Sequence, residues 1–320
     1  MSAAVRHLLV PFASASASDH GLLWPSPPVQ DLPHLAALLH RLQAVAQTEC
    51  GPDTPSMPYE LVLAGLLGLP AEPGRVPWAA FETRTVGEPC GWIKPCHLQV
   101  GGDQVRLGDA ALLGLQEAES RALLETAAPY FAEDGIRLTY ALPGAWLALG
   151  EPLRGLTTWS TDRLAGRQLT PGVLLQSTGP FGPLWQRLQN EMQMLFYTHP
   201  CNDERVRRGQ LPVNAIWLTG AGVLDALPAP APHVVVENRL CASGVALDAA
   251  AYRQAWQAVD ADACAALLAE CRAGRPVRLT LAGEQRAITF APRPASLRAR
   301  IASMFSARPT LAVLDTLSST

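Results

Sequence analysis

The stretch 184–222 constrains the fold more than any other part of the sequence, because it joins a helical pattern to a buried strand. Its first part, with the residues just before it, carries apolar side chains at steps of three and four, which places them on one side of an α-helix: Phe181, Leu184, Trp185, Leu188, Met192, Leu195 and Phe196. Pro200 ends the pattern. After a charged segment, the apolar run 213–218 predicts a strand. This succession is typical of an α/β protein.

Two ionisable residues of this helix are candidates for chemistry. His199 falls on the apolar arc one turn after Leu195 and Phe196. It is either a buried histidine bonded to a backbone carbonyl or a catalytic group, and a single imidazole without a matched partner does not decide between them. Glu191 lies at the edge of the arc, where it either reaches solvent or faces a pocket.

The segment between helix and strand reads as a charged loop. Arg205, Arg207 and Arg208 lie within four positions, and each guanidinium offers a fork of donors suited to phosphate or carboxylate. The alternative is a solvated loop whose charges pair among themselves. Asn214 and the glycines of Gly220-Ala221-Gly222 complete the candidate anion site, since a glycine turn after a strand lets backbone N–H groups approach a ligand. The turn lacks the G-x-G-x-x-G and G-K-[ST] patterns.

Composition excludes several classes of protein. The 320 residues are 48% hydrophobic, enough for a sizeable core, and the net charge of −3 disfavours nucleic acid as the main partner. No stretch approaches the roughly 20 apolar residues of a membrane span. The seven cysteines show no C-x-x-C spacing, so we expect reduced thiols and a cytoplasmic location.

Other patterns along the chain predict further elements. We expect helices at 32–48, 59–69, 116–131 and 249–271. We expect strands at 5–12, 136–142, 145–149 and 234–237, and hairpins that pair 97–100 with 104–107 and 277–281 with 285–290. Gly135 should end the helix that begins at 116.

Several of these pieces, in this order, resemble the archaeal-type cofactor-independent phosphoglycerate mutases of the alkaline phosphatase superfamily. Residues 32–36 (LPHLA) are similar to their TPNLDRLA segment, and residues 64–70 (AGLLGLP) to their LALLGYDP. Residues 94–109 and the following Glu117-Ala118 resemble the hairpin and helix of their inserted substrate domain. Residues 212–222 resemble their N-x-x-x-x-RGAG strand and turn.

The chain also resembles a bacterial group named for the regulatory protein RpfE. That resemblance rests on Trp92-Ile93-Lys94-Pro95-Cys96-His97, Pro129-Tyr130-Phe131 and Gln189-Asn190-Glu191-Met192-Gln193. It implies a regulatory role by association.

The departures from the mutase pattern bear on activity. The mutase resemblance implies two divalent metals held by Asp and His and a serine that takes the phosphoryl group. Here Tyr59 occupies the nucleophile position and Thr219 replaces the turn arginine, while no histidine follows His233. The remaining candidates are Ser56 as a nucleophile and Asp19 with His20 as metal ligands.

The sequence therefore predicts an α/β fold like that of the alkaline phosphatase superfamily, with a mixed or parallel sheet flanked by helices and a smaller inserted α+β domain. We expect core parts at 1–87 and 206–320 and the insert at 88–205. The favoured function is a non-catalytic regulatory or ligand-sensing protein without cofactors, binding a small phosphorylated or carboxylated anion or a protein partner. The alternative is a diverged mutase or phosphotransferase that uses Mn or Zn, with Tyr59, Ser56 and His199 as catalytic candidates.

Overall fold

The computed structural model describes residues 5–14, 16–17, 22–23, 27–101, 104–108, 110–164, 167–174, 177–246, 248–293 and 310–318. The chain divides into two compact units. Unit 1 comprises residues 1–53, 57–67 and 230–320, and unit 2 comprises residues 54–56 and 68–229. Within the described residues, no helix combines the length and apolar character needed to cross a membrane.

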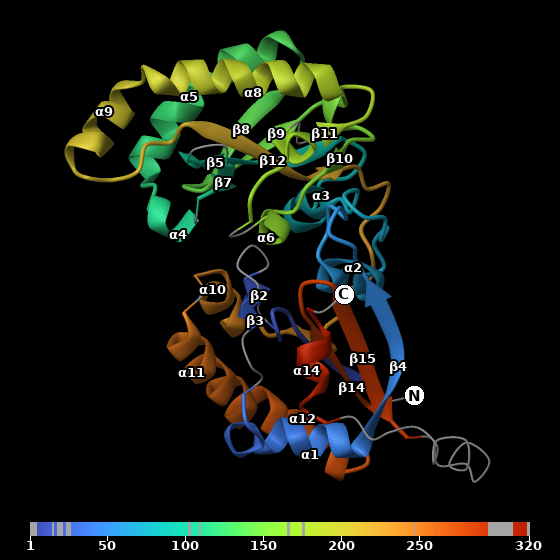
Figure 1. Ribbon diagram of the computed structural model, residues 1–320. Helices are drawn as coiled ribbons and strands as arrows, with labels where there is room; N and C mark the ends of the chain where they lie inside the picture. Colours follow the sequence, from blue (N-terminus) through green and yellow to red (C-terminus); the bar gives the residue numbers. More distant parts are fainter. Residues whose placement is uncertain are drawn as a thin grey trace. The chain divides into compact units, whose positions relative to one another are not determined.

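Unit 1 is built on a five-stranded mixed sheet of order β13-β1-β14-β15-β4 (Figure 1). β1 (Arg6–Val10) pairs in parallel with β13 (Val234–Val236) and β14 (Val277–Ala282). β15 (Arg286–Pro292) pairs antiparallel with β14 and with β4 (Leu42–Glu49). Leu8, Leu279 and Phe290 belong to one continuous buried cluster of this sheet and its helices. The predicted strand at 5–12 and the hairpin that follows 277 are confirmed.

The helices of unit 1 supply the rest of this apolar core. They are α1 (Pro33–Arg41), α2 (Pro58–Leu67), α10 (Arg239–Ala246), α11 (Ala249–Val259), α12 (Ala265–Arg272) and the short α14 (Val313–Thr316). A π-helical turn, η3 (Asp260–Cys264), joins α11 to α12. Its buried Asp260 accepts hydrogen bonds from the backbone N–H groups of His34 (3.1 Å) and Leu35 (2.7 Å). Asp260 thus caps the N-terminus of α1, whose own N-cap residue Leu32 has no side-chain acceptor.

The helix predicted at 32–48 is wrong in its second half. The helix ends at Arg41, and residues 42–49 form the edge strand β4. The apolar residues at 35, 38 and 39 are buried as predicted, whereas Val45 is 48% exposed. Pairing along the whole of β15 supplies the backbone hydrogen bonds of this segment, and it overrides the helical spacing.

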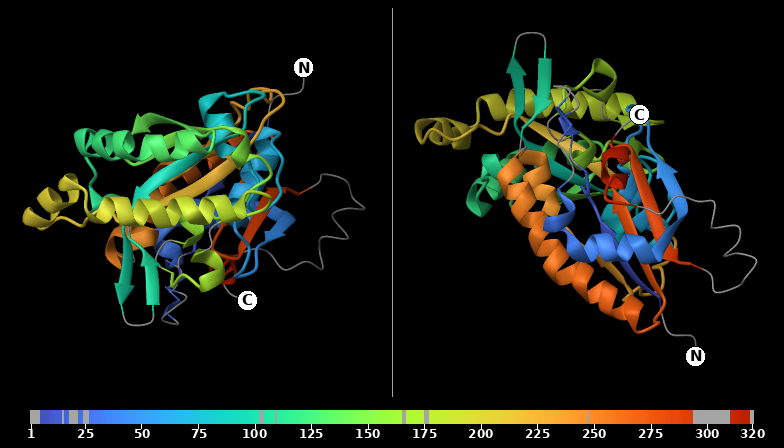
Figure 2. Two further views of the ribbon diagram at one scale, coloured as in Figure 1. Left: turned by 90° about the horizontal axis from the view of Figure 1, so that it is seen from above. Right: turned by 60° about the horizontal axis from the view of Figure 1, so that its bottom comes forward.

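Unit 2 contains a four-stranded antiparallel sheet of order β12-β5-β9-β8. Its strands are β5 (Cys90–Cys96), β8 (Arg137–Leu142), β9 (Ala145–Leu149) and β12 (Ala215–Gly222). The helices α5 (Glu117–Glu133) and α8 (Gly182–Tyr197) lie side by side along this sheet (Figures 1 and 2). The core between them includes Phe131, Trp146, Trp185 and Phe196. The helix predicted at 116–131 and the strands at 136–142 and 145–149 are confirmed, and Gly135 has φ +74° just after α5.

Smaller elements complete the two units. In unit 1 they are β2 (Ser16–Ala17), β3 (Leu22–Leu23) and η1 (Val29–Asp31). In unit 2 they are α3 (Trp78–Thr83), β6 (Leu98–Gly101), β7 (Gln104–Leu107), α4 (Ala110–Leu113), η2 (Glu151–Leu153), β10 (Thr157–Thr158), α6 (Thr161–Leu164), α7 (Pro171–Leu174), β11 (Ser177–Thr178) and α9 (Pro200–Arg207). β6 and β7 form the predicted hairpin.

The fold class is confirmed as α/β, with a mixed sheet flanked by helices and an inserted second unit. The bounds of the insert differ from the expected 88–205. Strand β12 pairs antiparallel with β5, and α3 packs against both, so residues on either side of the expected insert join unit 2. Unit 2 is also as large as unit 1 rather than smaller.

A buried histidine should make the stability of unit 1 depend on pH. His7 Nε2 lies 2.7 Å from Thr280 Oγ1, whose hydroxyl lies 2.8 Å from that of Thr289. Burial, with smaller contributions from Arg278 and His233, lowers the pKa of His7 to about 4 from an ordinary 6.5. Between these values the unfolded chain binds the extra proton, so stability is fully present above pH 6.5 and falls as the pH drops toward 4.

We expect a loss of up to about 3 kcal/mol from this group between pH 7 and pH 4. The measurement is the urea midpoint of unit 1 at both pH values. The variant His7→Gln, which cannot titrate, should lose correspondingly less on acidification. An identical pH dependence in the two proteins would contradict the assignment to His7.

Candidate functional site

Helix α8 presents three distinct faces. The face formed by Trp185, Leu188, Met192 and Phe196 is buried against the sheet, as the sequence predicts. A second face carries only carboxamides, at spacings of three and four: Gln186, Gln189, Asn190 and Gln193. A third face carries Arg187, Glu191 and Met194, with the partly buried Leu195 beside them and Thr198 at the C-cap. Of these three faces, the apolar spacing predicts only the first.

The segment after α8 is a helix, α9, rather than the charged loop expected from its composition. Asn202 fixes it in place. The Nδ2 group of Asn202 donates to the carbonyls of Phe196 (2.8 Å) and Val213 (2.7 Å), and its Oδ1 accepts from the N–H of Val213 at 2.8 Å. One amide thereby ties the end of α8, α9 and the start of β12 together.

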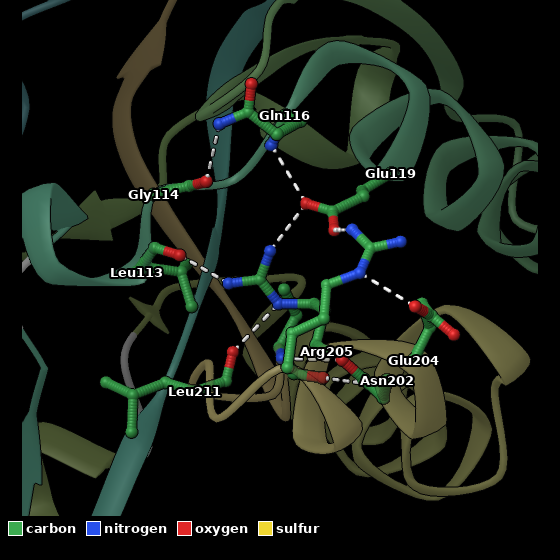
Figure 3. A network of polar contacts seen from close by, with 10 residues as sticks. Leu113, Gly114, Gln116, Glu119, Asn202, Glu204, Arg205 and Leu211 are labelled. Atoms are coloured by element: carbon green, nitrogen blue, oxygen red, sulfur yellow. Dashed lines mark hydrogen bonds and ion pairs between the residues drawn. The ribbon is translucent and has the colours of Figure 1, made fainter.

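Arg205 lies at the centre of a buried polar network (Figure 3). Its side chain is fully buried. Nη1 donates to Glu119 Oε2 at 2.5 Å, Nε donates to the carbonyl of Leu211 at 2.8 Å, and Nη2 donates to the carbonyl of Leu113. Glu119 also accepts from the N–H of Gln116 at 3.0 Å, which completes the N-terminal cap of α5. The network therefore connects α9 to the start of α5 and to α4.

The other two arginines of the predicted anion site are exposed. Arg207 lies 2.5 Å from Glu204, and Arg208 lies 2.7 Å from the same carboxylate and 3.9 Å from Glu119. Arg207 and Arg208 thus pair with a carboxylate of their own segment, as the second interpretation of the sequence expects, whereas Arg205 pairs with Glu119 on α5.

His199 occupies the N-cap of α9. Its Nδ1 accepts from the N–H of Cys201 at 3.1 Å, and its Nε2 lies 3.1 Å from the hydroxyl of Thr126. Burial lowers the pKa of His199, and a hydrogen bond to the backbone of Ala122 partly offsets this. These contacts describe a neutral imidazole that joins α9 to α5.

The glycines after Leu218 continue strand β12 instead of forming a turn after it. The register of β12 against β5 shifts between Thr219 and Gly222. A Cβ on Gly220, which has φ +62°, would lie 3.0 Å from the Cβ of Trp78, and one on Gly222 would lie 2.8 Å from the Cβ of Pro77. The absence of side chains here lets α3 pack closely on β12. Asn214 bonds the N–H (2.7 Å) and the carbonyl (2.9 Å) of Leu98, which holds hairpin β6–β7 to β12.

The remaining candidates lie apart from this region. Ser56 is buried in unit 2, and its Oγ accepts from the N–H of Gly74 at 2.9 Å. Tyr59 belongs to unit 1, where its ring centroid lies 6.2 Å from that of Phe12. Asp19 and His20 lie outside the described residues. Within the described residues, no group of three or more His, Cys, Asp or Glu side chains could hold a metal ion.

A cleft that the sequence does not predict lies between the carboxamide face of α8 and hairpin β6–β7. Figure 2 shows the hairpin beside α8. The cleft has a volume of about 270 Å³ and is lined by Leu98, Val100, Val105, Gln186, Gln189, Asn190, Gln193 and Asn214. Asn214, a predicted ligand-binding residue, is thus at a cleft, although both ends of its amide already bond Leu98. The spacing of the carboxamides along 186–193 was the available signal.

A second, more open depression of about 460 Å³ covers the outward face of α8. It is lined by Tyr130, Asn190, Glu191, Met194, Leu195 and Thr198. Met194 is 76% exposed. Glu191 pairs with Arg187 through Oε1 at 3.0 Å, while its Oε2 is buried and, among the described residues, has no hydrogen-bond partner. We call this surface, with these six residues, the outer patch.

Comparison with known proteins gives likenesses of fold only. No protein-family model matches the chain, and no curated protein matches it. Among solved structures, it is similar to a cofactor-independent phosphoglycerate mutase from Thermoplasma acidophilum DSM 1728, with 16% identity over 99% of each chain and a TM-score of 0.37. It is also similar to the PH0037 protein from Pyrococcus horikoshii, with 12% identity over 99% of each chain and a TM-score of 0.38.

Proposed function

We propose that this protein is a non-catalytic regulatory protein that acts by binding a protein partner at the outer patch. The observation that carries the proposal is the combination of a highly exposed Met194 with a buried, unpartnered Glu191 oxygen on one helix face. Contiguous exposed apolar surface marks interaction sites, and Met194 lies with Tyr130 and Leu195 in the outer patch. A regulatory role is also what the resemblance to the RpfE-type group implies.

The chemistry of the outer patch specifies the partner. A buried carboxylate oxygen without a donor costs free energy until a donor reaches it. Arg187 contacts Glu191 only through Oε1. We therefore expect a partner segment that places a lysine or arginine against Glu191 and apolar side chains over Met194 and Tyr130.

The contacts of the catalytic candidates support a binding role over turnover. Ser56 Oγ accepts a backbone hydrogen bond in a buried position, and both ring nitrogens of His199 contact neighbouring groups. A serine nucleophile needs a base within hydrogen-bond reach and access to substrate. We keep the small-anion proposal for Arg207 and Arg208, where a phosphorylated or carboxylated anion would compete with Glu204.

The binding proposal is tested by selecting peptides from a random displayed library on the wild-type protein. We expect enriched peptides that combine Lys or Arg with apolar residues. Their affinity should fall about tenfold or more on Met194→Glu, because a charge is placed in the apolar centre of the contact. Glu191→Gln should selectively lower the affinity for the basic peptides.

The matched control is Val206→Glu, which alters another exposed apolar residue of unit 2, on α9, and should bind the peptides as wild type does. Peptides that bind Met194→Glu and wild type equally would refute the surface.

The catalytic alternative is tested in parallel. The protein is incubated with Mn²⁺ or Zn²⁺, its metal content is measured by elemental analysis, and phosphoglycerates are offered as substrates. About two tightly held metals per chain would support the phosphotransferase alternative. So would a turnover that disappears when Ser56→Ala and Tyr59→Phe are combined, and that result would overturn the non-catalytic proposal.

A further inference from the structure

The cleft between α8 and hairpin β6–β7 has two chemically different walls. One wall is formed by the carboxamides of Gln186, Gln189, Asn190 and Gln193. The other is formed by Leu98, Val100 and Val105. Val100 and Val105 are directly paired across the hairpin, so their side chains share one face of it. The cleft thus offers hydrogen bonds along one side and apolar contact along the other.

Gln189 indicates that this cleft accommodates a ligand. It is only 6% exposed, and it lines the cleft. Among the described residues its carboxamide has no hydrogen-bond partner, and the same holds for Gln186, Asn190 and Gln193. A carboxamide without a protein partner keeps its donors and its acceptor for water or for a bound molecule. Four neighbouring carboxamides without protein partners are therefore available to a bound molecule.

The lining of the cleft restricts the chemical class of that molecule. No charged side chain is among the described residues that line it, so an ionic group would lose its hydration there without a counter-charge. Carboxamides each carry a donor and an acceptor, so they suit a ligand edge that presents both. Asn and Gln form such paired bonds with the edge of adenine in particular.

The hairpin presents a side-chain face to the cleft, which disfavours a peptide that adds as an extra strand. Strand addition requires a free backbone edge, with its N–H and C=O groups turned to the ligand. Here Leu98 and Val100, two positions apart on β6, line the cleft with the paired Val105. A flat apolar face suits the plane of a heterocyclic ring. The volume of about 270 Å³ lies near the lower end of small-molecule sites, about 300 Å³.

We propose that this cleft binds an uncharged nucleobase or its nucleoside, with adenine as the best match. The base edge bonds the carboxamides of Gln189 and its neighbours, and the base plane packs on Val100 and Val105. The inference extends the proposed function, because it supplies the small molecule that a regulatory binding protein would sense.

The experiment titrates adenosine, guanosine, cytidine and uridine into the full-length protein by calorimetry. We expect saturable binding, tightest for adenosine. Gln189→Met keeps the length of the side chain and removes its hydrogen bonds. It should lower the affinity for adenosine about tenfold, because one paired hydrogen-bond contact is lost. Its melting temperature should stay close to that of wild type, because the replaced amide has no hydrogen-bond partner among the described residues.

The matched control is Gln99→Met, on the residue between Leu98 and Val100 whose side chain points to the opposite face of the hairpin. It should bind adenosine as wild type does. Absence of saturable binding by all four nucleosides, or equal binding by wild type and Gln189→Met, would overturn the proposal. Met194→Glu should retain nucleoside binding, so failure here is distinguishable from failure of the outer patch.

Discussion

Replacement of Arg205 by methionine should lower the free energy of unfolding of unit 2 by about 3–5 kcal/mol, the range for breaking a buried ion pair from one side. Arg205 is fully buried and reaches Glu119 and the carbonyls of Leu113 and Leu211 in three directions. Methionine fills part of the volume but leaves two carbonyls without their donor and removes the buried charge that pairs with Glu119, which keeps the N–H of Gln116. The cost therefore comes from the groups left behind.

The measurement is the urea transition followed by tryptophan fluorescence, since Trp146, Trp185 and Trp217 are buried in unit 2. Arg205→Lys should recover little of the stability lost in Arg205→Met, because an ammonium cannot reproduce the planar fork that bonds three acceptors. Arg207→Met, on an exposed arginine of the same helix, should change stability by about 0.5 kcal/mol or less. A mild effect at Arg205, together with loss of anion binding, would instead assign it to the ligand site that the sequence suggested.

Gly220→Ala should lower the free energy of unfolding of unit 2 by about 2–5 kcal/mol, combining about 1–2 kcal/mol for an L-residue at positive φ with about 1–3 kcal/mol for overpacking. Gly220 has φ +62°, and its new Cβ would meet the Cβ of Trp78 at 3.0 Å and the N of Ala79 at 3.4 Å. Both contacts belong to α3, a helix that also packs on β5. The substitution therefore forces α3 away from the sheet.

Gly209→Ala is the matched control. Gly209 has φ +71°, close to that of Gly220, but nothing lies within 4 Å of its added Cβ. Gly209→Ala should lower the free energy of unfolding by about 1–2 kcal/mol in the same urea transition, the cost of an L-residue at positive φ alone. Equal losses at the two glycines would mean that crowding by α3 contributes nothing. The difference between the two losses of stability measures the cost of crowding a Cβ against α3.

Elements set by local signals were predictable from the sequence, and elements set by distant pairing were not. Gly135 ends α5 because it reaches φ +74°, and Pro143-Gly144 separates β8 from β9; both signals are local. The wrong interpretation of 42–49 came from a helical period that continued past Arg41. Residues 42–49 form a strand because they pair with β15, which lies far along the chain.

The same distinction applies to the candidate site. The cluster of arginines in 205–208 was visible, but their partners were not, because Glu119 lies 86 positions from Arg205. The charged segment forms α9 because Asn202 and His199 cap and anchor it, which its composition does not reveal. The carboxamide row was present in the sequence, yet its meaning depends on the hairpin that faces it. Whether the predicted residues bind a ligand stays a prediction.

Asn190 lines both the cleft beside hairpin β6–β7 and the outer patch. If a ligand bound in the cleft fixes the Asn190 side chain, the affinity of the outer patch for its partner should change. Such coupling is mutual: the factor by which a nucleoside alters partner affinity equals the factor by which the partner alters nucleoside affinity. The protein would then respond to two ligands through one turn of helix α8. The concentration of the nucleoside would determine how much of the protein is bound to its partner.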